Sequence, residues 1–240
     1  MICNFKMIGR VTLWHCKKRA RIIVIISLTI FLLLYGCAWR NDELSELFTS
    51  YLGGFRQSAQ LALLWLAVHL PVEGLVYGWI MNQANRLYYA KLLKYESKMS
   101  YFLFMIIAAL VQLILYYGIG YGTLTVLYHE ENIRLILWQL SLTSLESLNI
   151  VLVAAAFSLF YPKLENIAFP AVIAAELGNC LLCGSNERLR FLPFTYGKLV
   201  LQKDFFDNGI ALAISLLMLG VLLAFVGILW LRKDERSRGS

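Results

Sequence analysis

The sequence predicts an all-α membrane protein, a polytopic bundle of six transmembrane helices. Its composition is 60% hydrophobic and only 15% charged, whereas soluble domains are about 45–50% apolar and about 25% charged. Six apolar stretches are each long enough to cross ~30 Å of hydrocarbon as a helix. Because these stretches are continuous rather than alternating, they favour helices over the strands of a barrel.

The expected spans divide a single transmembrane domain that covers residues 1–240. They lie at 22–39, 58–81, 101–127, 135–161, 166–183 and 210–231. Residues 1–21 precede the first span and hold six Lys or Arg and no acid. We interpret them as a basic cytoplasmic leader that can lie along the inner membrane surface.

The positions of the basic residues predict the orientation. If both termini are cytoplasmic, the cytoplasmic parts hold 15 of the 22 Lys and Arg residues, as the positive-inside rule requires. We therefore expect a multi-pass protein of the cell (plasma) membrane. The net charge of +7 fits this orientation and an affinity for anionic membrane lipid. No nucleic-acid-binding signature is present, so we expect no nucleic-acid partner.

The cytoplasmic connection 82–100 has the pattern of an amphipathic helix. Tyr88, Leu92 and Tyr95 recur at helical spacing, and Lys91 and Lys94 form a neighbouring stripe. Such a helix can rest on the inner leaflet, dock onto a soluble partner, or form a solvated hairpin. On the outer side, residues 184–209 mix charges with large apolar side chains, which is typical of a segment lying at the interface.

Three carboxylates fall inside expected spans: Glu73, Glu146 and Glu176. An ionised carboxylate at mid-bilayer costs ~2.5–3.5 kcal/mol on insertion scales, so each should face the bundle interior or a wet cavity. Other polar residues accompany them at helical spacing. The whole set is His69, Glu73, Gln139, Thr143, Glu146, Asn149, Glu176 and Asn179. These residues are either hydrogen-bonding groups between helices or a polar path for transport.

Two short patterns have less specific meanings. Residues 119–122 match the core of a potassium filter, but Gly118 stands where Thr is expected. Close packing of small residues with tyrosines at the interface explains this pattern better. Cys180 and Cys183 form a C-x-x-C that ends an apolar span, and no second pair accompanies it. No P-loop or clustered metal ligands occur, so we expect no bound cofactor or metal.

The layout resembles the permease subunits of type-2 ABC exporters, particularly small ones of bacteriocin export or immunity. The resemblance lies in the length, the six spans with both ends inside, and the leader ending Lys17-Lys18-Arg19. It is topological and covers the whole chain. It places the ATPase contact at residues 85–98 and an outer re-entrant element at 191–206, before the last span.

The resemblance implies a permease that moves a peptide or lipid-like substrate while a separate ABC ATPase subunit hydrolyses ATP. The chain itself would then be no enzyme, and it would work as a homodimer or with a paired permease. The residues implied in coupling to the ATPase are Arg86, Tyr88, Lys91, Leu92, Lys94 and Tyr95. Two alternatives remain open. One is a proton-coupled secondary transporter using the intramembrane glutamates, and the other is a membrane assembly or redox protein.

Overall fold

The computed structural model describes residues 19–36, 59–86, 98–128, 133–185 and 208–237. These residues are helical apart from Tyr161, and none of them is in a strand. The prediction of an all-α fold is therefore confirmed for the described part of the chain. Continuous apolar sequence favours this outcome because a helix satisfies its backbone hydrogen bonds within one segment.

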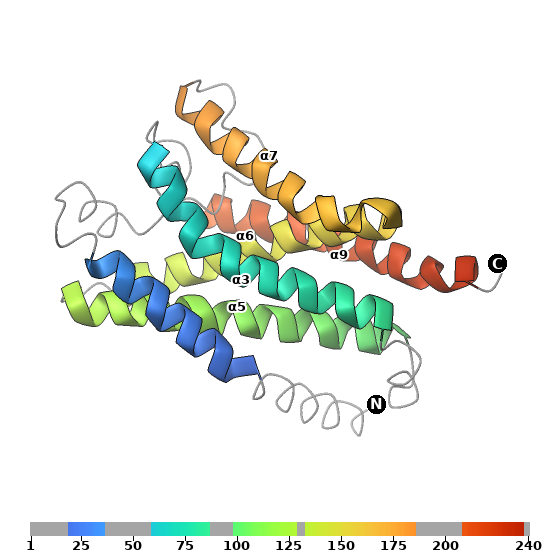
Figure 1. Ribbon diagram of the computed structural model, residues 1–240, viewed down its shortest axis with the longest axis horizontal. Coiled ribbons are helices and arrows are strands. Elements are labelled where there is room, and N and C mark those ends of the chain that lie inside the picture. Colours follow the sequence, from blue (N-terminus) through green and yellow to red (C-terminus); the bar gives the residue numbers. More distant parts are fainter. Residues whose placement is uncertain (1–18, 37–58, 87–97, 129–132, 186–207, 238–240) are drawn as a thin grey trace.

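The helices occupy the places of the expected spans. They are Arg19–Gly36, α3 (Ala59–Arg86), α5 (Lys98–Tyr128), α6 (Ile133–Phe160), α7 (Glu165–Ser185) and α9 (Asn208–Ser237). A short 3₁₀ helix, η1 (Pro162–Leu164), joins α6 to α7. Successive helices run in opposite directions along the bundle (Figure 1).

Four helical segments are long and apolar enough to cross a membrane. They are Arg19–Gly36, Met99–Leu127, Ile136–Phe160 and Leu212–Arg232. The other two helices, α3 and α7, are not among these four, so a crossing by them stays a prediction. Several helices continue beyond the expected spans, most clearly α3 to Arg86 and α9 to Ser237. A helix keeps its hydrogen-bond ladder in water, whereas apolar composition marks only the part that lipid surrounds.

Helix α6 lies at the centre of the bundle. It packs against α3, α5, α7 and α9, and 78% of its apolar segment is buried, compared with 17% for α9. In Figure 1, α3 and α5 lie beside α6, and α7 lies at the edge of the bundle. The many polar residues of α6 are therefore enclosed by other helices rather than exposed to lipid.

The helix Arg19–Gly36 packs across α3 and α5. Ser27 donates a hydrogen bond of 2.7 Å to the carbonyl of Tyr116, and the ring of Phe31 lies edge-on to Tyr116 and Tyr121. The Phe31 ring also occupies the space that a Cβ on Gly120 would need. The glycine of the filter-like pattern thus allows close helix packing within a continuous helix, as expected.

Candidate functional site

Two polar side chains of α3 begin the site. His69 and Glu73 are one helical turn apart and therefore share a face. Both are buried, and the Nδ1 of His69 lies 3.6 Å from the Oε1 of Glu73. Pro71 lies between them within the helix. Because Pro lacks an N–H, it removes one bond of the helical ladder at this point.

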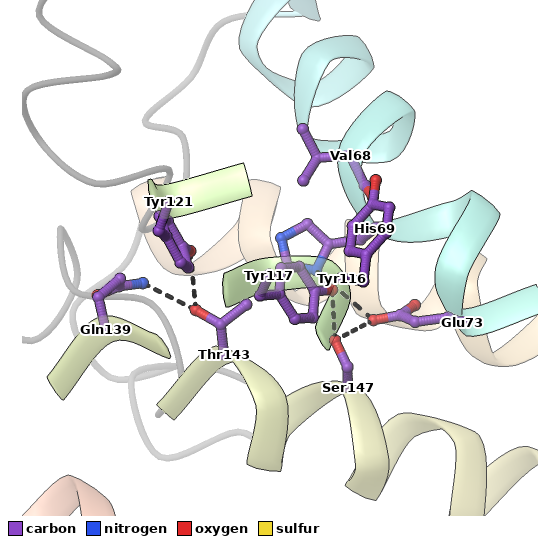
Figure 2. A network of polar contacts seen from close by, with 9 residues as sticks. All are labelled: Val68, His69, Glu73, Tyr116, Tyr117, Tyr121, Gln139, Thr143 and Ser147. Carbon is purple, nitrogen blue, oxygen red and sulfur yellow. Dashed lines mark hydrogen bonds and ion pairs between the residues drawn. The ribbon is translucent and has the colours of Figure 1, made fainter. Parts of the chain in front are cut away.

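Tyr117 of α5 and Ser147 of α6 complete a closed group of four side chains. The Tyr117 hydroxyl lies 2.8 Å from the Nδ1 of His69 and 2.7 Å from the Oγ of Ser147. Ser147 in turn donates a hydrogen bond of 2.7 Å to Glu73 Oε1. Figure 2 shows the four side chains converging from three helices. We call these residues the His–Glu cluster.

A second polar group lies one helical turn away, after Tyr117 on α5 and before Ser147 on α6. The Tyr121 hydroxyl is 3.1 Å from the Oγ1 of Thr143, and Gln139 donates to the same Oγ1 at 3.0 Å. Tyr117 and Tyr121 are stacked, with ring centroids 6.3 Å apart. The stacked rings join the His–Glu cluster to this second group (Figure 2).

The polar residues expected on α6 do not all face the same neighbour. Gln139 and Thr143 meet α5, whereas Asn149 donates a hydrogen bond of 3.2 Å to the Ser215 carbonyl of α9. At about 100° per residue, Thr143 and Asn149 point about 120° apart around the helix axis. The polar face of α6 is therefore wide enough to contact two helices.

The remaining expected residues are placed as follows. Glu146 is buried on α6 and interacts electrostatically with Tyr121, and Glu176 is buried on α7. Asn179 belongs to α7, but its side chain lies outside the described residues. Arg86 ends α3, and its side chain is likewise outside them. The other expected coupling residues lie outside the described part of the chain: Tyr88, Lys91, Leu92, Lys94 and Tyr95.

Sequence reasoning missed the hydroxyl groups that connect the site. Tyr121 is buried, and Tyr117 is fully enclosed, so both side chains point into the bundle rather than toward its outer surface. Each hydroxyl has a polar partner on α6, which removes the need for water. The spacing of these residues could have indicated the contact. Tyr117 and Tyr121 are four residues apart, as are Thr143 and Ser147, so each pair shares one face of its helix.

A pocket of about 770 Å³ lies apart from the cluster, between the C-terminal half of α3 and the start of α7. Tyr77 and Phe169 line it and stack with their ring centroids 5.1 Å apart. Asn82 and Asn166 add amide groups from the two helices. The Tyr77 hydroxyl lies 2.6 Å from Ser158 Oγ and donates to the Glu165 carbonyl at 2.8 Å. Tyr77 thus ties α3 to the junction of α6 and α7.

Among the residues that the structure describes, no three His, Cys, Asp or Glu side chains form a group that could hold a metal ion. Comparison of the chain with protein-family models, with curated proteins and with solved structures finds no significant match. Any proposal about function therefore depends on the residues and on the helical architecture.

Proposed function

We propose that the chain is the membrane-spanning permease subunit of an ABC-type exporter. In this proposal, six helices cross the plasma membrane, both termini are cytoplasmic, and two permease chains work with a separate ATPase subunit. The observation that carries the proposal is the arrangement of the helices. They alternate in direction around a central α6 (Figure 1), and basic residues are concentrated in the connections expected at one end of the bundle.

The enclosed polar core supports a moving bundle rather than a fixed pore. Polar side chains from α3, α5 and α6 bond directly to groups on neighbouring helices, including a backbone carbonyl of α9. Such bonds can be exchanged when helices shift between two packings, which is the usual form of a transport transition. A peptide or lipid-like substrate would then pass between paired chains rather than through the centre of one.

Purification from the native membrane tests the ATPase partner directly. The expected result is that a P-loop ATPase without membrane spans copurifies with the intact chain. Replacing Tyr88, Leu92 and Tyr95 by Ser should remove the ATPase while leaving the permease in the membrane, because these residues form the apolar face of the expected docking helix. A matched variant with Lys91 and Lys94 replaced by Arg should retain it. Recovery of the triple variant with its ATPase would contradict this docking face.

A proton-coupled secondary transporter is the second candidate. The buried position of Glu73, Glu146 and Glu176 inside the bundle favours it, because buried intramembrane carboxylates are typical of proton pathways. The expected result for this candidate is that Glu146→Gln abolishes transport driven by a proton gradient, with no ATPase required. Transport that persists in Glu146→Gln and stops when ATP is depleted would favour the exporter instead.

A further inference from the structure

Three hydrogen bonds link the side chains of the His–Glu cluster in series. From His69 Nδ1 the chain passes to the Tyr117 hydroxyl at 2.8 Å, to Ser147 Oγ at 2.7 Å and to Glu73 Oε1 at 2.7 Å. The four side chains are buried, with at most 3% of any residue's surface exposed. The chain therefore has an ionisable group at each end and a hydroxyl at each of its two inner positions (Figure 2).

Counting protons restricts how this chain is ordered. A hydroxyl carries one proton, so each of the two inner groups can donate in only one direction along the chain. When every group donates in the same direction, all three hydrogen bonds are made and each hydroxyl both donates once and accepts once within the chain. There are two such directions of donation, one from His69 to Glu73 and one from Glu73 to His69. Both are compatible with the same distances between the heavy atoms.

The two directions correspond to two locations of one proton. When the hydrogen bonds run toward Glu73 and both ring nitrogens of His69 carry a proton, His69 is an imidazolium and Glu73 is a carboxylate. When they run toward His69, the imidazole is neutral and Glu73 is a carboxylic acid. Both arrangements have zero net charge, whereas adding or removing a proton leaves an uncompensated charge in the bundle interior, which is unfavourable at low dielectric.

We propose that His69 and Glu73 hold a single proton between them, and that Tyr117 and Ser147 relay it. In the forward step the His69 Nδ1–H bond breaks as a Tyr117 O–H bond forms. Tyr117 passes its own proton to Ser147, and Ser147 passes its proton to Glu73. The Nε2 proton of His69 stays in place, and no other reactant is required. The site is a proton-binding site, and its existence does not depend on the exporter proposal.

Other titratable groups lie near the cluster but outside the chain. On α5, the Tyr116 hydroxyl donates to the Val68 carbonyl and Tyr121 contacts Thr143. Residues with a formal charge on the helices that pack against α3 include Glu146 on α6, Glu176 on α7, and Arg19, which reaches the Leu75 carbonyl of α3. Because Tyr116 is buried edge-on to Tyr117 and its hydroxyl donates to the backbone carbonyl of Val68 rather than to the cluster, it provides a matched control.

Nitrogen NMR of the histidine rings tests the proposal on the full-length protein in lipid bilayers. The protein has three His, so the ring signals of His69 can be assigned from their absence in His69→Gln. In the wild type, the Nδ1 signal should lie between the positions of a protonated and a bare nitrogen and should move with temperature. In Glu73→Gln, His69 should keep one ring proton at every temperature, because Gln cannot accept a proton.

The hydroxyl variants separate a relay from a simple ion pair. Tyr117→Phe and Ser147→Ala should each move the Nδ1 signal to a limiting position, whereas Tyr116→Phe should leave it as in the wild type. A helical circular dichroism spectrum and a monodisperse size distribution show that a variant is folded. If one of the two hydroxyl variants does not fold, the other is sufficient for the test. A wild-type signal that matches Glu73→Gln at all temperatures would overturn the shared proton. An unchanged signal in a folded Tyr117→Phe or Ser147→Ala variant would overturn the relay.

Discussion

At the scale of single residues, small side chains and hydroxyls determine how closely these helices approach. Gly120 illustrates this, because the Phe31 ring fills the space next to its Cα. Ser147 and Thr143 similarly allow the large rings of Tyr117 and Tyr121 to lie against α6 while satisfying their hydroxyls. Small and polar residues at helix contacts are the usual means of association in membranes, where burial of apolar surface gives little driving force.

Gly120→Ala should destabilise the bundle, because the added methyl group meets the Phe31 ring. Overpacking of this kind typically costs ~1–3 kcal/mol of unfolding free energy. Gly122 on the same helix is exposed, with nothing near its missing Cβ. Gly122→Ala should therefore be neutral or slightly stabilising, since Ala is favoured over Gly in a helix by about 1 kcal/mol.

Reversible unfolding in mixed micelles, monitored by circular dichroism, compares these two variants. The Phe31→Leu exchange should reduce the penalty of Gly120→Ala, because the shorter side chain leaves room for the methyl group. Equal stability of Gly120→Ala and Gly122→Ala would show that Phe31 does not pack against this glycine as described.

At the scale of elements, the tight junction between α6 and α7 positions α7 against α3. The chain reverses through Tyr161 and η1, where the Leu164 N–H bonds to the Tyr161 carbonyl at 2.9 Å. The Tyr77 hydroxyl then connects α3 to Ser158 on α6 and to the Glu165 carbonyl of α7. One side chain thus holds three elements together at the rim of the pocket.

Tyr77→Phe should loosen this junction while keeping the ring stacked on Phe169. Removing the hydroxyl takes this donor from the half-buried Glu165 carbonyl, and the net loss of one such hydrogen bond costs about 0.5–1.5 kcal/mol. Tyr161→Phe is the control, because Tyr161 is exposed at the same turn and exposed changes usually stay within about 0.5 kcal/mol. Unfolding in micelles measures the free energy of unfolding of both variants. An equal loss of stability in the two would argue against the proposed role of the Tyr77 hydroxyl.

The positions of the helices could be predicted from the sequence, whereas their neighbours could not. Long apolar runs place α5, α6 and α9 because hydrocarbon thickness sets a minimum length. The burial of Glu73 and Glu146 also follows from the high cost of charge in lipid. The contact of Asn149 with α9 instead of α5 depends on tertiary packing. Tyr117 was missed because tyrosine is also common at membrane interfaces, so its type alone does not indicate burial.

At the scale of the whole molecule, polar groups are concentrated around α6 while α9 exposes apolar side chains such as Leu217 and Val221. This distribution matches a bundle whose outer surface contacts lipid and whose interior bonds are made between helices. The charge distribution adds a direction, since basic residues are concentrated in alternate connections. Architecture and charge together lead to a specific expectation for the topology.

Reporter fusions should place both ends of the chain in the cytoplasm. A reporter active only outside the membrane should be active when inserted in the 37–58, 129–132 or 186–207 connections, and inactive within 87–97 or at the C-terminus. The reason is that positively charged segments are retained on the cytoplasmic side. Replacing Lys17, Lys18 and Arg19 by Gln should produce a mixed orientation, whereas Arg in place of the two lysines should not. Termini found on opposite sides would require an odd number of crossings. Either α3 or α7 would then be the helix to reassign, because neither is among the four described segments that are long and apolar enough to cross a membrane.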